Sequence, residues 1–139
     1  MGTVVVTGSA GSIGSRVCAL LAADEAVDEV IALDTNQRDG TRRKVTYHKV
    51  DLLRDDLKPL IEDALTVVHL ASSFDPKNDG IDTAHVDAEA TRRVLEAASG
   101  VGVTRVVLLS SAMVYGAWDT NPVPITEAHP VNPNPDFSF

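Results

Sequence analysis

The sequence predicts an α/β domain built on a doubly wound parallel sheet, and three observations lead to that prediction. Short apolar runs alternate with helical patterns along the chain, as in folds whose helices cross over between parallel strands. A glycine-rich turn follows the first run, and polar residues stand at or just past the ends of the runs. We expect five strands in the order 3-2-1-4-5, with a ligand beyond their carboxyl ends near the switch between strands one and four.

The glycine-rich turn over residues 7–14 joins the first strand to the first helix. Gly8 permits a tight exit from the strand, Gly11 lets a phosphate approach the backbone, and Gly14 lets the helix pack closely on the strand. The free N–H groups at the start of the helix point to the same place, so an anionic pyrophosphate fits there. A turn without a ligand is the alternative that glycines alone leave open.

Asp34 stands at the end of the second apolar run, 20 residues after Gly14. Its carboxylate can accept hydrogen bonds from both hydroxyls of an adenosine ribose, whereas a 2′-phosphate there would meet like-charge repulsion. This favours NAD over NADP. Arg42 and Arg43 could bring a positive charge to such a phosphate, or they could be solvated charges of a polar loop.

Hydrophobic periodicity sets the expected bounds of the elements. Apolar residues at i, i+4, i+7 and i+8 give the first helix one face toward the sheet. The fourth and fifth strands are apolar throughout, a pattern typical of strands buried on both faces. The patterns predict strands over residues 3–6, 29–34, 44–50, 66–71 and 104–109, and helices over 12–23, 53–63 and 81–98.

The two later helices and the end of the chain carry further expectations. The short helix over 53–63 should turn Leu57, Leu60 and Ile61 inward, and Pro59 leaves the position of its start open. The long helix, from Ile81 to Ala98, presents a broad face of small residues that could serve the sheet on one side and a partner helix on the other; two glycines follow it and end it. Beyond residue 110 the periodicity stops and prolines gather, so we expect a loop there and not a sixth strand.

Composition describes an ordinary globular protein. A chain of 139 residues is one domain by length. Its net charge of −8 argues against a nucleic-acid partner, and no apolar run approaches the roughly 18 residues of a membrane span. The single Cys18 excludes an internal disulfide and suits a reducing compartment. Because the first strand begins at Thr3, there is no room for a signal peptide, and we expect a cytoplasmic protein.

Polar residues near the strand ends are candidates for ligand contacts. Asp51 could accept a hydrogen bond from an adenine amino group, or it could cap the following helix. His69 is expected to face the packing of the sheet and not to be catalytic. Ser111, next to Ser110, could orient a substrate hydroxyl or carbonyl for hydride transfer, or the pair could only end a strand and start a turn. No His, Cys, Asp or Glu cluster has the spacing of metal ligands.

Together, these motifs resemble a known family. They are the glycine turn at 7–14, Asp34, Asp51 with Leu52, His-Leu-Ala-Ser at 69–72, Thr-Arg-Arg-Val-Leu-Glu-Ala-Ala at 91–98, Ser-Ser-Ala-Met-Val-Tyr-Gly at 110–116 and Pro-Ile-Thr-Glu-Ala-His-Pro at 124–130. Over essentially all its length the chain resembles the extended short-chain dehydrogenase/reductases, which have a Rossmann-type fold. More narrowly, it resembles the NAD-dependent epimerase/dehydratase family, which acts largely on nucleotide sugars.

The resemblance implies roles for individual residues. Asp34 would bind the adenosine ribose, Asp51 with Leu52 would line the adenine pocket, and Ser111 would be the active-site serine. The chemistry would be transient or net hydride transfer at a carbinol carbon, with NAD as the oxidant. The implied cofactor-binding residues are Gly8, Ser9, Ala10, Gly11, Ser12, Ile13, Gly14, Asp34, Asp51, Leu52, Leu70, Ala71, Ser72 and Ser110.

The chain departs from the family pattern in two places. The family has an asparagine on its long helix where this chain has Asp87. Its catalytic Tyr-x-x-x-Lys pair would begin where this chain ends, at Phe139, and Tyr115 is no substitute because no lysine follows it. We therefore expect residues 1–139 to be an incomplete dinucleotide-binding domain, the amino-terminal portion of a longer enzyme.

Three functional hypotheses follow. The first is the cofactor half of an NAD-dependent epimerase or dehydratase that acts on a nucleotide sugar. The second is a reductase or dehydrogenase of the same superfamily that acts on a non-sugar alcohol or ketone. The third is an NAD-binding sensor module without catalysis. In the family the long helix contributes to a dimer interface, so the resemblance also implies a possible homodimer through residues 81–98. A sheet edge or a helix face should be left uncovered.

Overall fold

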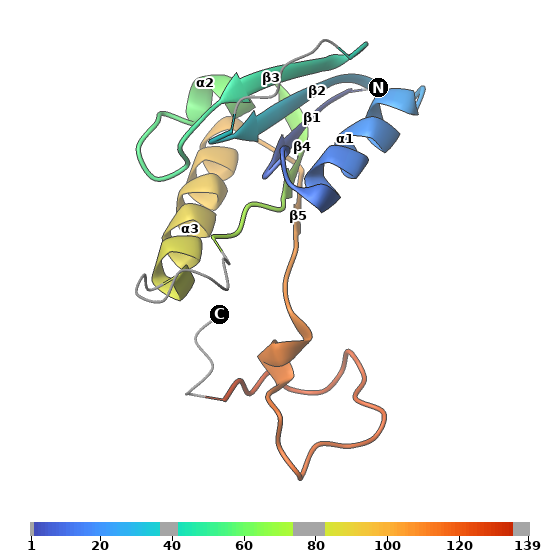
Figure 1. Ribbon diagram of the computed structural model, residues 1–139, viewed down its shortest axis with the longest axis vertical. Helices are drawn as coiled ribbons and strands as arrows, with labels where there is room; N and C mark the ends of the chain where they lie inside the picture. The colour runs from blue at the N-terminus through green and yellow to red at the C-terminus, as the bar shows by residue number, and fades with distance from the viewer. Residues whose placement is uncertain (1, 37–41, 74–82, 135–139) are drawn as a thin grey trace.

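The computed structural model describes residues 2–36, 42–73 and 83–134. Within these ranges a parallel sheet is flanked by helices on both faces (Figure 1). In chain order the elements are β1 (Gly2–Thr7), α1 (Ser12–Ala23), β2 (Val27–Asp34), β3 (Val45–Lys49), α2 (Lys58–Ile61), β4 (Ala64–His69), α3 (Thr83–Val101), β5 (Arg105–Leu108) and the 3-10 helix η1 (Ala112–Tyr115).

The strands are parallel and lie in the order β3-β2-β1-β4-β5, which confirms the predicted topology. β1 is central: Val5 pairs with Ile31 of β2 on one side and with Val67 of β4 on the other. The strand order reverses beside β1, and in such sheets a crevice opens at the carboxyl ends of the strands at that point. The sheet therefore places the ends of β1, β2 and β4 around one site.

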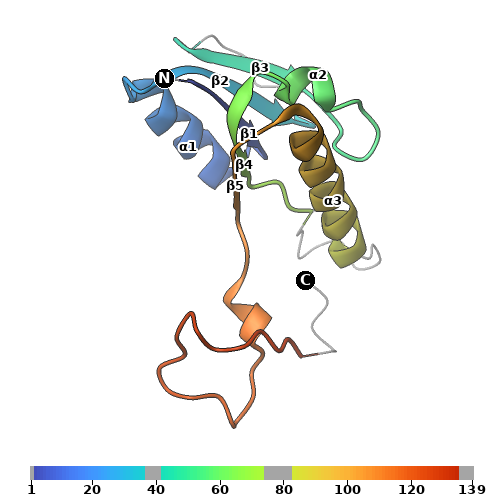
Figure 2. The same cartoon turned by 180° about the vertical axis from the view of Figure 1, so that it is seen from behind.

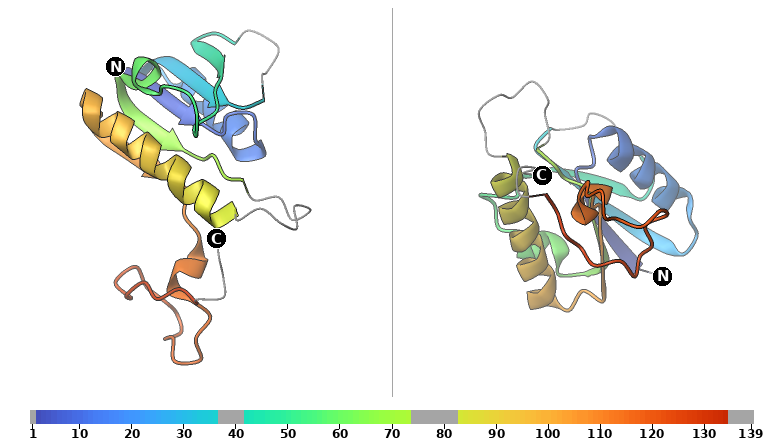
Figure 3. Two further views of the ribbon diagram at one scale, coloured as in Figure 1. Left: turned by 90° about the vertical axis from the view of Figure 1, so that its left-hand side faces the viewer. Right: turned by 90° about the horizontal axis from the view of Figure 1, so that it is seen from below.

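Two apolar clusters pack against the two faces of the sheet. Alternate residues of a strand point to opposite faces, so Val5 packs with residues of α2 and α3, whereas Val4 and Val6 pack with Cys18 of α1. Figures 2 and 3 show α1 on one face of the sheet and α3 on the other. Cys18 is buried in the second cluster, where it fills space as a small apolar side chain.

The segment between β3 and β4 differs from the expected helix over 53–63. Only Lys58–Ile61 is helical. The carboxylate of Asp51 accepts a hydrogen bond from the N–H of Leu53, 2.9 Å away, and such a local side-chain bond favours a turn over a helix. Ile61 is nevertheless fully buried, as the inward face of the predicted helix requires.

β5 lies at the edge of the sheet and is exposed along its whole length. The prediction that its apolar run is buried on both faces is wrong, because no residue of β5 belongs to either apolar cluster, and among the described strands only β4 pairs with it. The expected uncovered sheet edge is therefore present. Beyond β5 the chain leaves the sheet as a loop that contains η1, and no sixth strand occurs in residues 109–134, as predicted (Figure 1).

α3 lies over the face formed by Val5 and Val67. Its buried residues Ala90, Val94, Ala97 and Ala98 belong to the side turned toward the core, while Leu95 on the outer side is 45% exposed. The helix runs through Gly100 to Val101, past the expected end, and stops before the positive φ of Gly102. Ile81, the expected first residue, lies outside the described residues. No helix in the described ranges is long and apolar enough to cross a membrane.

Candidate functional site

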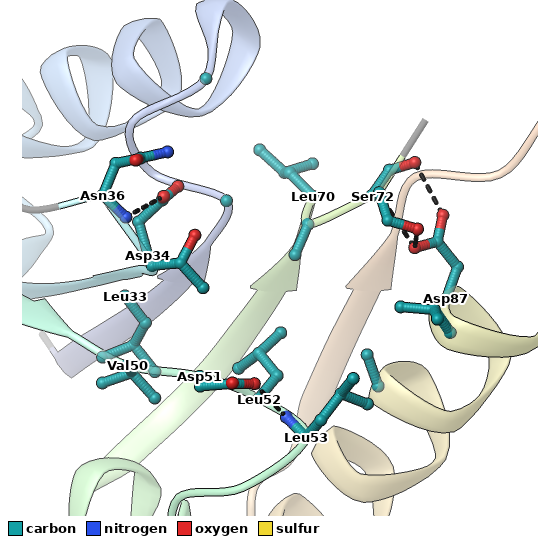
Figure 4. A pocket seen from close by; sticks show the side chains of 17 residues that line it. Leu33, Asp34, Asn36, Val50, Asp51, Leu52, Leu53, Leu70, Ser72 and Asp87 are labelled. Carbon is teal, nitrogen blue, oxygen red and sulfur yellow. Dashed lines mark hydrogen bonds between the residues drawn. The ribbon is translucent and has the colours of Figure 1, made fainter. Parts of the chain in front are cut away.

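A cavity of about 380 Å³ opens at the carboxyl ends of the strands (Figure 4). Its walls come from the ends of β1, β2 and β4, from the segments that follow β2, β3 and β4, and from one side of α3. This is the crevice that the strand order predicts. The lining residues are Gly8, Gly11, Leu33, Asp34, Thr35, Asn36, Val50, Asp51, Leu52, Leu53, Leu70, Ala71, Ser72, Ser73, Val86, Asp87 and Ala90.

Two glycines of the turn after β1 are required by close backbone contacts. Gly8 has a φ of +69°, and a Cβ there would lie 2.7 Å from the backbone nitrogen of Ala71. A Cβ on Gly14 would overlap the carbonyl oxygen of Gly8. The turn, the strand end of β4 and the first turn of α1 are thus packed backbone to backbone, as the sequence predicts for these two positions.

The amino end of α1 faces the cavity without a cap of its own. Gly11 occupies the N-cap position, so no side chain caps the helix, and its first turn holds no acidic residue. The first helical hydrogen bond joins the N–H of Ser15 to the carbonyl of Gly11 at 3.0 Å. The N–H groups of Ser12, Ile13 and Gly14 precede it and have no acceptor within the helix, so they are available to an anion.

Two predicted cofactor contacts, Ser9 and Ala10, use their N–H groups inside the protein. The N–H of Ser9 donates to the carbonyl of Leu33 at 3.2 Å, and the N–H of Ala10 donates to Oδ2 of Asp34 at 2.9 Å. The side chain of Ser9 is buried. These residues therefore attach the glycine turn to the end of β2, and neither belongs to the cavity lining.

Asp34 is held in a fixed orientation at the edge of the cavity. Besides Ala10, the N–H of Asn36 donates to its Oδ1 at 2.8 Å, and Figure 4 shows this contact beside the glycine turn. Each carboxylate oxygen has two lone pairs, so each retains an acceptor site after these bonds. The carboxylate can therefore receive two further hydroxyl donors without moving.

Asp51 lines the cavity and also closes a turn. Its Oδ1 accepts from the N–H of Leu53, and its Oδ2 forms an ion pair of 3.5 Å with the exposed Arg54. Asp51 thus caps a turn, close to one of the two alternatives that the sequence leaves open. Arg93 of α3 fixes the same segment, because its guanidinium donates to the carbonyls of Leu53 at 2.8 Å and Asp55 at 2.7 Å.

Asp87 holds the opposite wall. Its carboxylate accepts hydrogen bonds of 2.7 Å from the hydroxyl of Ser72 and from both the N–H and the hydroxyl of Ser73, as Figure 4 shows. The departure from the family's asparagine therefore leaves a side chain that binds the segment after β4. A carboxylate suits this place because all three partners are donors.

His69 is 2% exposed, as expected for a residue that faces the packing of the sheet. Burial lowers the pKa of its imidazole, and the negative charge of Asp87 opposes that shift only in part. The imidazole is therefore neutral near pH 7. It is not among the lining residues, although it precedes Leu70, which is one, and it hydrogen-bonds Thr7 and Thr91.

The structure brings together most, but not all, of the predicted site residues. Gly8, Gly11, Asp34, Asp51, Leu52, Leu70, Ala71 and Ser72 line the cavity. The other predicted residues are not in the lining: Ser9, Ala10, Ser12, Ile13, Gly14, Ser110 and Ser111. Ser110 and Ser111 are exposed on the segment that leaves the sheet, and Oγ of Ser111 accepts from the N–H of Met113 at 3.2 Å. In this arrangement Ser111 caps η1, which corresponds to the turn alternative of the sequence analysis.

Sequence reasoning missed several lining residues. Val86 and Ala90 are four residues apart, so they lie on one face of α3, and this face lines the cavity. Their helical spacing can be read from the sequence, but it does not distinguish residues that line a cavity from residues that pack in the core. Leu33, Thr35, Asn36, Val50, Leu53 and Ser73 adjoin predicted site residues. Position beside a strand end is the signal that could have found them.

The charges around the cavity favour some ligands over others. Its lining includes the carboxylates of Asp34, Asp51 and Asp87, and no Lys, Arg or His is among the described residues that line it. An anion can be held here by backbone N–H groups and the amino end of α1. A 2′-phosphate on a ribose near Asp34, however, would be repelled by the negative charge of that carboxylate. No group of three or more His, Cys, Asp or Glu in the described ranges could hold a metal ion.

Known proteins are similar to this chain in sequence and fold. The chain is 32% identical to UDP-glucuronic acid decarboxylase 6 of Arabidopsis thaliana, over 95% of this chain and 39% of the relative, and 32% identical to UDP-glucose 4-epimerase of Streptomyces lividans, over 95% and 42%. A solved structure of MoeE5 in complex with UDP-glucuronic acid and NAD superposes with a TM-score of 0.78 at 31% identity, over 95% of this chain and 43% of that one. The chain thus spans about two fifths of the length of these proteins.

A family model extends the match to nearly every residue. The model of the NAD dependent epimerase/dehydratase family matches residues 4–138, a range that contains the glycine turn, Asp34 and the whole cavity lining. The family is NAD-dependent, in agreement with a site that offers a ribose acceptor and an uncapped helix end. With its fold, its cavity and its sequence in agreement, the chain belongs to the NAD-dependent epimerase/dehydratase family.

Proposed function

We propose that this chain carries the NAD-binding half of an enzyme that acts on a nucleotide sugar. The observation that supports the proposal most is Asp34, a carboxylate fixed by two backbone N–H groups beside the uncapped start of α1. A pyrophosphate at the helix end would leave the adenosine ribose within reach of that carboxylate. The substrate class is taken from the relatives, whose names include UDP-sugars.

In this proposal each wall of the cavity has a task. Gly8 and Gly11, with the first N–H groups of α1, including those of Ser12, Ile13 and Gly14, hold the pyrophosphate. Asp34 accepts the ribose hydroxyls. Asp51 and Leu52 line the adenine end. Leu70, Ala71 and Ser72 follow the cofactor toward its nicotinamide end. When bound, NAD supplies a hydride acceptor, and these residues orient it.

Ser111 is proposed to orient a substrate hydroxyl or carbonyl at the nicotinamide end, next to Ser110. In the described arrangement Ser111 is exposed and caps η1. The role therefore requires the segment after β5 to lie closer to the cavity when a substrate is bound. A homodimer through α3 is proposed as well, supported by the exposed Leu95 on the outer side of that helix.

A second candidate function is an NAD-binding sensor without catalysis. One observation favours it: the cavity lining is drawn from residues 8–90, and neither Ser110 nor Ser111 is part of it. A sensor requires the dinucleotide site alone. A reductase acting on a non-sugar alcohol or ketone is the further alternative, which no described residue favours.

The test is a calorimetric titration of the 139-residue chain with NAD and with NADP, for the unaltered protein, Asp34→Asn and the control Asp28→Asn. Asp28 is an exposed aspartate on β2. We expect NAD to bind more tightly than NADP, and Asp34→Asn to weaken NAD by roughly tenfold or more, because hydrogen bonds to a charged group contribute about 1.5–3 kcal/mol. Asp34→Asn should also reduce the difference between the affinities for NAD and NADP, because the variant no longer repels the 2′-phosphate of NADP.

Asp28→Asn should bind as the unaltered protein does. A folded chain, judged by circular dichroism, that binds neither dinucleotide would contradict the proposal. So would an Asp34→Asn variant with unchanged affinity for NAD. Addition of UDP-glucose or UDP-glucuronic acid to the NAD complex then tests the substrate class, with a heat of binding as the expected result.

A further inference from the structure

Three polar side chains form a connected group beneath the floor of the cavity. Thr7 at the end of β1 is fully buried, and His69 at the end of β4 is 2% exposed. Oγ1 of Thr7 lies 2.7 Å from Nδ1 of His69, and Nε2 of His69 lies 3.0 Å from Oγ1 of Thr91 on α3. One imidazole therefore joins two neighbouring strands of the sheet to the helix that covers them.

The donors around Thr7 decide which imidazole nitrogen carries the proton. Oγ1 of Thr7 accepts from the N–H groups of Leu70 and Ala71, each at 3.3 Å, and the N–H of Leu70 is shared with the backbone carbonyl of Thr7, also at 3.3 Å. A hydroxyl has two acceptor lone pairs and one hydrogen. Both lone pairs of Thr7 are thus engaged, so its hydrogen is left for Nδ1 of His69. Nδ1 must then be the unprotonated nitrogen, and Nε2 carries the hydrogen and donates it to Thr91.

Leu70 and Ala71, whose N–H groups Thr7 orients, are wall residues of the cavity. They also face the glycine turn, since a Cβ on Gly8 would lie 2.7 Å from the nitrogen of Ala71. A shift of the Leu70–Ala71 backbone would therefore move the surface against which Gly8 is packed. The position of both segments depends on the hydroxyl of Thr7, and that hydroxyl is oriented by His69.

We propose that His69, as the neutral imidazole protonated at Nε2, is a positioning residue for the dinucleotide site. It acts through Thr7, which fixes the backbone after β4 against the glycine turn after β1, and it is anchored to α3 by Thr91. The part of this inference that concerns ligand affinity rests on the proposed NAD-binding function. The part that concerns the tautomer does not.

The surroundings of His69 explain why it stays neutral. β1 presents the hydroxyl of Thr7, α3 presents the hydroxyl of Thr91, and β5 places the uncharged Leu108 in register with it. The one charged group that acts on it among the described residues is Asp87 of α3. A second imidazole proton would have to sit on Nδ1, opposite a hydroxyl whose lone pairs are already engaged.

The pH dependence follows from the sign of this effect. Burial lowers the pKa of His69 in the folded chain below its ordinary value, so below about pH 6.5 the unfolded chain binds a proton that the folded chain does not. The contribution of His69 to stability is therefore complete above about pH 6.5 and is lost as the pH falls toward the folded-state pKa. The affinity of the folded chain for NAD should decline only when the pH falls through the folded-state pKa of His69, where the imidazole gains its second proton.

The first test is the tautomer, read from the imidazole ¹⁵N shifts of the ligand-free chain near neutral pH. We expect the His69 signals of an unprotonated Nδ1 and a protonated Nε2. A proton on Nδ1, in either the other tautomer or the imidazolium, would overturn the inference. Because no NAD is present, a chain that binds no dinucleotide still gives this result, and so the failure of the proposed function is distinguished from the failure of this inference.

The second test compares Thr7→Val, which keeps the shape and removes the hydroxyl, with Thr7→Ser, which keeps the hydroxyl. We expect Thr7→Val to weaken NAD by about tenfold, the equivalent of one lost hydrogen bond, and Thr7→Ser to remain within about threefold. Equal affinities for the two variants would count against the inference. Should Thr7→Val fail to fold, Thr91→Val and Thr91→Ser provide the same comparison from the α3 side.

The third test measures urea unfolding of the unaltered chain and of His69→Gln as the pH is lowered from about 7.5 to about 5.5. We expect the unaltered chain to lose stability in this interval and His69→Gln to lose less, because glutamine does not titrate. An identical loss in both proteins would show that other groups cause the pH dependence and would contradict the role given to His69.

Discussion

β4 and β5 are adjacent parallel strands with nearly the same apolar composition, but their side chains are buried to different extents. Val67 of β4 is fully buried, whereas its register partner on β5, Val106, is 37% exposed and the next residue, Val107, is 46% exposed. β4 has β1 on its other side and α3 over one face, while β5 has a single strand neighbour among the described residues. The difference shows that burial of an apolar strand is set by the strands and helices that surround it, not by its own sequence.

The largest expected effect comes from making the same substitution, valine to aspartate, in each of the two strands. Val67→Asp places a carboxylate in a fully buried position, and burial of an unpaired charge costs several kcal/mol, so we expect this variant to be unfolded in buffer. Val107→Asp exposes its carboxylate to water and should change the free energy of unfolding by less than about 1 kcal/mol. Urea unfolding followed by circular dichroism measures both. Similar losses in the two variants would mean that β5 is as covered as β4.

The second prediction compares two helical glycines, one packed against backbone and one open. A Cβ on Gly14 would overlap the carbonyl of Gly8, while a Cβ on Gly100 would meet nothing nearer than the side chain of Lys58 at 3.5 Å. We expect Gly14→Ala to destabilise the chain by about 3 kcal/mol through overpacking. Gly100→Ala should stabilise it by up to about 1 kcal/mol, since alanine favours the helix. The expectation would be refuted if thermal unfolding showed that both substitutions change the stability in the same direction.

The smallest expected effects come from a comparison of two adjacent residues of α3, one that contacts the rest of the protein and one that is exposed. Arg93 donates to the carbonyl of the lining residue Leu53 and to that of Asp55 two residues later. Arg92 pairs with Glu89 and Glu96 on the exposed side of the helix. We expect Arg93→Gln to cost about 1–3 kcal/mol of stability and to weaken NAD binding. Arg92→Gln should leave both quantities unchanged within error, because exposed ion pairs contribute little. A larger loss for Arg92→Gln in either measurement would be contrary to this expectation.

Much of the fold could be predicted because local pattern and position in the sheet agree. Alternation of strands and helices gives the parallel sheet, and the glycine turn marks its first crossover. The late start of the helix expected over 53–63 was signalled by Pro59, which lies in the first turn of α2. The turn before it could not be foreseen, because the bond from the N–H of Leu53 to Asp51 depends on one side-chain rotamer. The exposure of β5 depends on which strands are beside it, and a single apolar run carries no such information.

The residues of the site can likewise be divided into those that the sequence could predict and those that it could not. Asp34, Asp51 and Ala71 were predictable because each stands at or just past a strand end, and parallel strands bring their carboxyl ends together. Val86 and Ala90 were not, because the wall of a cavity and the wall of a core have the same residue types. The turn arrangement of Ser111 depends on where the chain goes after β5, which no local motif specifies.

The central position of β1 has a consequence for how the chain is made. β1 leaves the ribosome before the other described strands, yet one of its two edges is paired by β4, more than fifty residues later in the chain. Until Ala64–His69 has emerged, that edge has its N–H and C=O groups unpaired, and Thr7 has no imidazole beside it. The glycine turn is therefore synthesised early, but it acquires its final surroundings only when β4 and α3 have followed. Nascent chains that end before α3 should be the ones that need protection from aggregation.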